Sequence, residues 1–148
     1  METDTGFSLV LNKMIREGRI EGKGGTVLTP TGLASLNTLL TLRNLAMARN
    51  AQRTLEVGLA YGSSCLVFVQ SHVDLGHTPA GQHVAMDPFQ QDMGDAGLLQ
   101  AERAGHSAYL TFHREASHQV LPRLLGEGRQ PDDICDGQAG FKRLLALC

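Results

Sequence analysis

The sequence predicts one α/β domain in which helices flank a parallel sheet. Three short apolar stretches with strand-like composition, residues 54–57, 83–86 and 108–112, alternate with helix-like segments. This alternation is typical of parallel strands joined by crossover helices. A chain of 148 residues also has the length of a single domain with one main core. We place this domain at residues 31–148, after an N-terminal segment of residues 1–30.

The N-terminal segment contains an amphipathic stretch at residues 7–15. The run REGRIEGKGG, residues 16–25, has no apolar period and is rich in glycine, so it is expected to be a loop. Leucines at helix-like steps then predict a helix over residues 31–49, and Pro30 suits its first turn.

A strand, a glycine turn and a helix follow one another in the middle of the chain. Residues 54–57 are expected to form a strand that stops at Gly58. The triplet Gly62-Ser63-Ser64 then opens a helix, with a serine as its cap. The following run, CLVFV, has a composition typical of strands, so the helix prediction depends on its context.

Two further strand and helix units continue the pattern. Each is bounded by residues that favour turns or helix ends. The expected elements are a turn at 76–81, a strand at 83–86 that ends at Asp87-Pro88, a helix at 94–104 closed by Gly105, a strand at 108–112 and a helix at 117–125 capped by Ser117.

The pattern weakens after Gly128. Between residues 128 and 140 the main apolar residues are Ile134 and Cys135, so a fourth strand is not predicted. A last helix is expected over residues 141–148. Without further strands beside the first, the sheet would keep an exposed edge, which favours self-association. We therefore expect a domain that is truncated or degenerate at its C-terminal side.

Composition excludes several classes of protein. The formal net charge is −2, from 13 Lys and Arg against 15 Asp and Glu, and Trp is absent, so a basic or base-stacking nucleic-acid surface is not expected. No apolar run reaches the length of a membrane span, and the N-terminus lacks the features of a secretory signal. A cytoplasmic location is the default expectation. Three cysteines without a C-x-x-C pair predict free thiols.

The most informative motif is the glycine turn in TLEVGLAYGSS, which contains Glu56, Gly58 and Gly62. Two glycines let the backbone turn sharply and approach a ligand, and the following helix N-terminus favours a carboxylate or phosphate. Asp87 ends the next strand, and the carboxyl ends of neighbouring parallel strands meet at one edge of the sheet. We therefore expect Asp87 beside the glycine turn, at a crevice of nucleoside size.

These segments, with HVAMDPF and AGHSAYLTFHREASHQVLPRLL, resemble the class I S-adenosylmethionine-dependent methyltransferases over residues 26–128. The local sequence is similar to that of their small-molecule O-methyltransferase-like and cephalosporin-hydroxylase-like branch. The resemblance implies a Rossmann-like fold, incomplete relative to the family's seven strands, with S-adenosylmethionine (SAM) as cofactor. It implies cofactor contacts at Glu56, Gly58, Tyr61, Gly62, Ser63, Asp87 and Glu115.

Within that set the resemblance implies separate roles. Gly58 and Gly62 would border the methionine part of the cofactor, Asp87 would hold the ribose hydroxyls, and the segment around Glu115 would lie near the adenine. Two simpler interpretations stay open. Tyr61 would then merely pack over the turn, and Asp87 would cap a helix or begin the Asp-Pro turn.

Other candidates for chemistry are His113, His118 and Asp136. Either histidine, beside the third strand, could remove a proton from a substrate hydroxyl, or both are exposed loop residues. In metal-dependent relatives an acid at the position of Asp136 helps to bind a divalent cation, but Gln138 stands where they carry a histidine. One carboxylate does not make a magnesium site, so Asp136 is kept as a candidate metal ligand, and an ordinary surface turn is the favoured interpretation.

The expected function is O-methyl transfer from SAM to a small-molecule acceptor. The alternative is a non-catalytic nucleoside-binding or interaction module derived from a methyltransferase. A nicotinamide-dependent oxidoreductase is disfavoured, because the turn has the spacing E-x-G-x-x-x-G and not G-x-G-x-x-G. The helix from Thr31 would either cover the active site or mediate contacts of a homodimer.

Overall fold

The structure, a computed structural model, describes residues 5–128, 133–136 and 144–145. Within these residues the main sheet has five strands in the order β5-β4-β3-β6-β7. Strands β3 to β6 are parallel, and β7 runs antiparallel to β6. This confirms the predicted α/β class. The strands are β3 Thr54–Val57, β4 His83–Met86, β5 Leu110–His113, β6 Asp133–Asp136 and β7 Leu144–Leu145.

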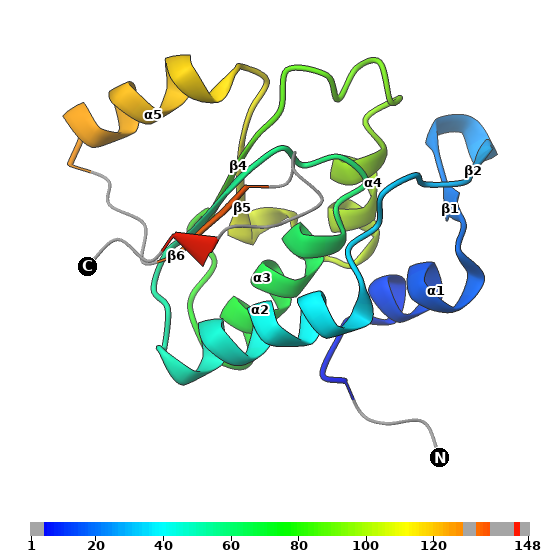
Figure 1. Cartoon of the computed structure of the whole chain (residues 1–148), viewed down its shortest axis with the longest axis horizontal. Coiled ribbons are helices and arrows are strands. Elements are labelled where there is room, and N and C mark those ends of the chain that lie inside the picture. Colours follow the sequence, from blue (N-terminus) through cyan, green and yellow to red (C-terminus); the bar gives the residue numbers. More distant parts are fainter. Residues whose placement is uncertain (1–4, 129–132, 137–143, 146–148) are drawn as a thin grey trace.

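Helices cover both faces of this sheet (Figure 1). The helix α5, Ser117–Gly126, packs Val120 and Leu124 against Leu55 and Met86 on one face. On the other face, α3 (Ser63–Asp74) and α4 (Ala96–Arg103) lie over the sheet, and Ala85 belongs to their apolar cluster. Side chains alternate between the faces along a strand. Thr54 and Glu56 on β3 and His83 on β4 are therefore on the α3 face.

The N-terminal segment packs onto this second layer. The helix α1, Leu9–Glu17, precedes a small antiparallel hairpin of β1, Ile20–Glu21, and β2, Val27–Leu28, with the 3-10 turn Lys23–Gly25 between them. The expectation of a plain loop over residues 16–25 is therefore wrong, because backbone pairing forms strands that the composition does not indicate. Buried residues of the segment share one core cluster with the helices α2 and α3, and they are Phe7, Leu11, Met14 and Ile20.

The helix predicted over residues 31–49 is confirmed in its body and corrected at its start. It is α2, Leu36–Ala48, and it begins after Ser35, whose side chain accepts a hydrogen bond from the Thr38 N–H. A serine cap satisfies a backbone donor of the first turn, and Gly32, with a φ of 81°, is not helical, so the helix does not extend back to Pro30. The expectation of Pro30 in the first turn is therefore wrong.

The C-terminal predictions are also corrected. A fourth parallel strand, β6, lies beside β3 with Thr54 opposite Asp133 and Val57 opposite Asp136. Pairing with a central strand stabilises a segment whose composition is weakly apolar. Leu144–Leu145 form strand β7 and not part of the expected helix over 141–148, whose other residues lie outside the described part. The side of β3 that was expected to lack strands therefore carries β6 and β7.

Two smaller boundaries also differ from the sequence prediction. The third strand starts at Leu110, two residues later than expected, because Ser107–Tyr109 form a 3-10 turn. The helix α5 has Ala116 at its N-cap, with no side-chain cap bond, so Ser117 is its first residue and not its cap.

In the residues that the structure describes, no helix has the length and apolar character needed to cross a membrane.

The N-terminal helix provides a test of the packing. Leu11 has no exposed surface, whereas Leu9 on the same helix is 87% exposed. Leu11→Ala is expected to lower the free energy of unfolding by about 2–5 kcal/mol, because it removes buried apolar atoms and leaves a cavity. Leu9→Ala, the matched control, is expected to change it by less than about 0.5 kcal/mol. Urea denaturation measures both, and equal effects would show that α1 is not packed in the core.

Candidate functional site

The carboxyl ends of four parallel strands meet at one edge of the sheet. In the register of the strands, His113 lies opposite Met86, Met86 opposite Val57, and Val57 opposite Asp136. The chain reverses its direction across the sheet at this place, since β4 and β5 lie on one side of β3 and β6 on the other. In open α/β sheets, ligands bind outside the carboxyl ends of the strands at such a switch point.

The glycine loop, residues 58–62, connects β3 to α3 at this switch point. Gly58 and Gly62 have φ angles of 85° and 84°, in the left-handed region that glycine adopts without strain. A Cβ atom at Gly62 would lie 3.0 Å from the carbonyl oxygen of Gly97. Gly62 is the N-cap of α3 and has no side-chain cap bond. The expected serine cap is therefore wrong, and the Ser64 hydroxyl instead donates to Glu56 Oε2 at 2.6 Å.

Asp87 holds this loop from the end of β4. Its Oδ2 accepts hydrogen bonds from the backbone N–H groups of Leu59, at 3.1 Å, and Ala60, at 3.0 Å. Its Oδ1 accepts from the Phe89 N–H at 2.8 Å. The residue is only 3% exposed. The sequence prediction that Asp87 lies beside the glycine turn is confirmed, and the contacts are with the backbone of the turn itself.

Gln90 is a site residue that sequence reasoning missed. Its Nε2 donates to the carbonyl of Ala60 at 2.7 Å and to Asp87 Oδ2 at 3.2 Å, while its Oε1 accepts from the Gly97 N–H. It has no exposed surface. Gln90 therefore ties the glycine loop to the start of α4. A glutamine in a turn has no periodic signal, and its position three residues after Asp87 was the sole sequence indication.

The predicted cofactor residues Glu56, Tyr61 and Ser63 occupy different depths. Glu56 is fully buried beneath the loop and contacts Ser64 and His83. Ser63 is buried in the first turn of α3, and half-buried Tyr61 packs against the core cluster of α2 and α3. Within the turn, Ala60 is exposed, whereas Leu59 and Gly62 are buried.

Glu56, Cys65 and His83 are buried together on the α3 face, with donor atoms within 4.8 Å of one another. This spacing suits a metal ion. However, His83 Nε2 lies 3.2 Å from Glu56 Oε1, as expected for a direct hydrogen bond. Burial, and next the nearby Glu56 charge, raise the pKa of the Cys65 thiol well above its usual value. Since a metal needs a thiolate, the three side chains fit a hydrogen-bonded core better than a metal site.

The residues after β5 form an ion-paired group at the sheet edge. Glu115 accepts from Arg123 at 2.8 and 3.1 Å, and this bond is the main cause of a lowered pKa of the Glu115 carboxyl. Arg123 also lies 3.4 Å from His113 Nδ1. Because a guanidinium only donates, Nδ1 is the acceptor and the proton is on Nε2. His113 Nε2 is buried and has no partner among the described residues.

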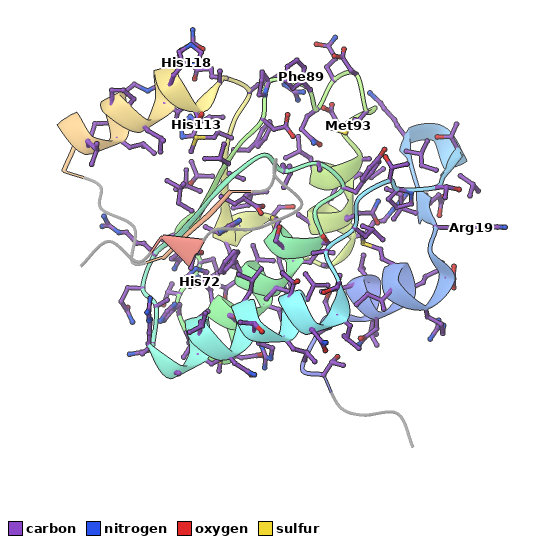
Figure 2. The ribbon with its side chains drawn as sticks, viewed as in Figure 1. Arg19, His72, Phe89, Met93, His113 and His118 are labelled. Carbon is purple, nitrogen blue, oxygen red and sulfur yellow. The ribbon has the colours of Figure 1, made fainter. Side chains whose placement is uncertain are left out.

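The other two predicted residues lie apart from this group. Figure 2 shows His118 on the outer side of α5, pointing away from the sheet, whereas His113 lies between α5 and the strands. Asp136 is the last residue of β6, opposite Val57, so its backbone is at the carboxyl edge. Its side chain lies outside the described part, and the metal prediction for Asp136 stays a prediction.

A cavity of about 400 Å³ lies elsewhere, between α1, the β1–β2 hairpin and α4. Met14, Ile20 and Gln100 are among its lining residues. Neither the glycine loop nor Asp87 contributes to it. This cavity is therefore separate from the carboxyl edge, where strand topology and loop geometry place the candidate site.

Comparisons with known proteins agree with this geometry at the level of the fold. No protein-family model and no curated protein sequence matches the chain. Among solved structures, it is similar to the O-methyltransferase TomG from Streptomyces achromogenes, involved in tomaymycin synthesis and crystallised with SAM, with 20% identity and a TM-score of 0.64. That match covers 93% of this chain and 54% of TomG.

Two further solved structures are similar. An O-methyltransferase from Bacillus cereus in complex with S-adenosylhomocysteine (SAH) matches with 19% identity and a TM-score of 0.59, over 72% of this chain and 46% of that one. A SAH-bound methyltransferase from Podospora anserina matches with 15% identity and a TM-score of 0.55, over 71% and 53%. The chain therefore has the Rossmann-like fold of SAM-dependent methyltransferases, which confirms the predicted fold. It spans about half the length of these proteins.

The contacts of Asp87 predict its effect on stability. Asp87→Ala leaves the Leu59, Ala60 and Phe89 N–H groups without their acceptor, so the free energy of unfolding is expected to fall by about 1.5–3 kcal/mol or more. Asp92→Ala is the control, because Asp92 is exposed in the same connection between β4 and α4. Urea denaturation compares the two variants. A loss no greater for Asp87→Ala than for Asp92→Ala would contradict the role of Asp87 as the acceptor of the loop.

The raised pKa of Cys65 predicts an unreactive thiol. At neutral pH its thiolate fraction is low and its sulfur is buried, so iodoacetamide is expected to label Cys65 far more slowly in the folded protein than in urea. Mass spectrometry of the peptide that contains Cys65 measures the labelling. Equally fast labelling in both conditions would show that the thiol is accessible and ionised.

Proposed function

We propose that the chain binds SAM at the carboxyl edge of its sheet and takes part in methyl transfer to an oxygen atom of a small-molecule acceptor. The fold is that of the matched methyltransferases, two of which are named as O-methyltransferases, and SAM or SAH occupies all three. The observation that carries the proposal is the glycine loop, which Asp87 and Gln90 hold at the switch point between β3 and β6.

The glycine loop and the start of α3 offer hydrogen-bond donors suited to the carboxylate of the methionine part of SAM. The N-terminus of α3 has backbone N–H groups without intrahelical partners and a partial positive charge, which favour a carboxylate. Gly58 and Gly62 would border the methionine part, with Tyr61 and Ser63 beside it. Glu56 would act indirectly, since it is buried behind the loop and holds Ser64.

The ribose contact would use the remaining capacity of Asp87. A carboxylate has about four acceptor positions. Oδ2 already accepts from Leu59, Ala60 and Gln90, whereas Oδ1 accepts from Phe89. A ribose hydroxyl would therefore donate to Oδ1. Glu115, two residues after the end of β5, would lie on the side of the adenine.

SAM, when bound, supplies a methyl group on a positively charged sulfur. This sulfur is a good leaving group when the methyl group is transferred. The chain would contribute by aligning the acceptor oxygen and removing its proton. His113 and His118 are the candidate bases from the sequence. His113 is at the carboxyl edge, whereas His118 points away from the sheet in Figure 2, so His113 is the better placed of the two. To act as a base, His113 would release the Arg123 bond so that Nδ1 is free to take the proton.

The test is a titration of the folded chain with SAH by calorimetry, with two glycine variants. The wild type is expected to bind with a dissociation constant on the order of micromolar. Gly62→Ala is expected to weaken binding by about tenfold or more, equivalent to about 1.4 kcal/mol. The reason is that its Cβ strains the loop and would lie 3.0 Å from the Gly97 carbonyl.

Gly76→Ala is the matched control, since Gly76 follows the other end of α3 with a φ of 76° and open space around its Cβ position. Both variants carry the cost of a side chain at positive φ, so a difference between them reports on the loop. Absence of SAH binding by the well-folded wild type would overturn the proposal. Binding without turnover of any hydroxylated acceptor would instead favour a non-catalytic binding module.

A further inference from the structure

A continuous chain of hydrogen bonds runs between α3 and the sheet, from exposed Gln52 to fully buried Glu56. His72, labelled in Figure 2, is at its middle. The links are Gln52 Nε2 to His77 Nε2 (3.2 Å), His77 Nδ1 to His72 Nδ1 (3.0 Å), His72 Nε2 to Thr54 Oγ1 (2.9 Å), Thr54 Oγ1 to His83 Nδ1 (2.8 Å) and His83 Nε2 to Glu56 Oε1 (3.2 Å).

The two ends determine the direction of every link. Gln52 Nε2 also donates to the Asn50 carbonyl at 2.9 Å, which identifies this atom as the amide nitrogen, a donor only. At the other end the Glu56 carboxylate only accepts. A neutral imidazole has one donor and one acceptor nitrogen. The N–H is therefore on Nδ1 in His77 and on Nε2 in His72 and His83, and each group donates toward Glu56.

We propose that this chain is a proton relay between solvent and Glu56. A solvent proton binds His77 Nε2 as the Gln52 amide turns away, and the Nδ1 proton of His77 passes to His72 Nδ1. The Nε2 proton of His72 passes to Thr54, whose own proton passes to His83 Nδ1. The Nε2 proton of His83 then binds Glu56 Oε1. One proton is gained, Glu56 becomes a neutral acid, and the three histidines stay neutral with their N–H groups exchanged.

The relay ends beneath the glycine loop. Glu56 Oε2 accepts from the Ser64 hydroxyl in the first turn of α3, two residues after Gly62. Hydrogen bonds to a charged acceptor are stronger than those to a neutral one. Protonation of Glu56 through the relay therefore weakens the contact that holds this turn. An effect of pH on SAM affinity by this route rests on the proposed function, whereas the relay itself does not.

Other ionisable groups lie near the relay. On α3, the Cys65 thiol is close to Glu56 and stays protonated, because burial raises its pKa. The Tyr109 hydroxyl donates to the His77 carbonyl. On β6, the backbone positions of Asp133 and Cys135 are opposite those of Thr54 and Glu56, and their side chains lie outside the described part. Neither the Cys65 thiol nor the Tyr109 hydroxyl forms one of the five links of the chain.

The first test needs no variant and no cofactor. Long-range proton–nitrogen NMR spectra of protein labelled with ¹⁵N-histidine, near neutral pH, report which ring nitrogen carries the proton. We expect His72 and His83 as Nε2–H tautomers and His77 as the Nδ1–H tautomer. A His77 ring with its proton on Nε2, or a doubly protonated His72 or His83, would overturn the assigned direction and with it the relay.

The second test breaks the relay at its centre. Thr54→Val removes the hydroxyl, and Thr54→Ser is the matched control that keeps it. The ring N–H of His83 is expected to exchange with solvent about tenfold more slowly in Thr54→Val than in the wild type, and at the wild-type rate in Thr54→Ser. If exchange occurred by local opening, the less stable Thr54→Val would exchange faster, and this result would overturn the relay.

The same samples test the link to the loop. In the wild type and in Thr54→Ser, the backbone amide signals of Gly62 and Ser64 are expected to shift with pH together with the His77 ring signals. In Thr54→Val this common shift is expected to be lost. If these amides stay unchanged in the wild type while the His77 ring signals change with pH, Glu56 does not receive the proton. Because no measurement uses SAH, failure of the relay is distinguishable from failure of the proposed function.

Discussion

The carboxylate of Asp87 is the constraint on which the carboxyl edge of the sheet depends. A loop with positive φ at Gly58, Ala60 and Gly62 turns its Leu59 and Ala60 N–H groups inward, where water does not satisfy them. A buried charge is equally unfavourable unless hydrogen bonds surround it. Each group satisfies the other, so the loop conformation and the burial of Asp87 are stable together. Gln90 completes this arrangement and connects it to α4.

The sheet surface behind the loop is polar where most parallel sheets are apolar on both faces. Thr54, Glu56 and His83 face α3, and each has a hydrogen-bond partner on the same layer. Phe68 stacks on the His83 ring with 5.0 Å between their centroids, which excludes water from one side of the network. Loss of one member would leave a buried partner unsatisfied, and such a loss costs more than the bond contributes. The network therefore behaves as a unit with the loop that it supports.

The strand and helix order of residues 54–125 was predictable because each apolar face repeats with the period of its element. The helix at CLVFV was predicted against its β propensity, and its burial along α3 explains why context decides. The sequence prediction failed where pairing partners, and not composition, create the structure. The hairpin of Ile20–Glu21 with Val27–Leu28, and β6 and β7, are such cases. Gln90 and the contacts of Ser64 were missed for a similar reason, because single polar residues have no period.

The sequence by itself determined the fold class and the position of the candidate site. Glycines at 58 and 62, and an acid after the second strand, are local requirements of a sharp turn and a sheet edge. The tertiary structure decided what these residues touch. Whether the Asp87 carboxylate faces a ligand or the loop backbone depends on the register between β3 and β4. That His83 meets Glu56 and Thr54 depends on side chains from two neighbouring strands pointing to one face of the sheet. Such contacts join residues up to 29 positions apart, and no local pattern encodes them.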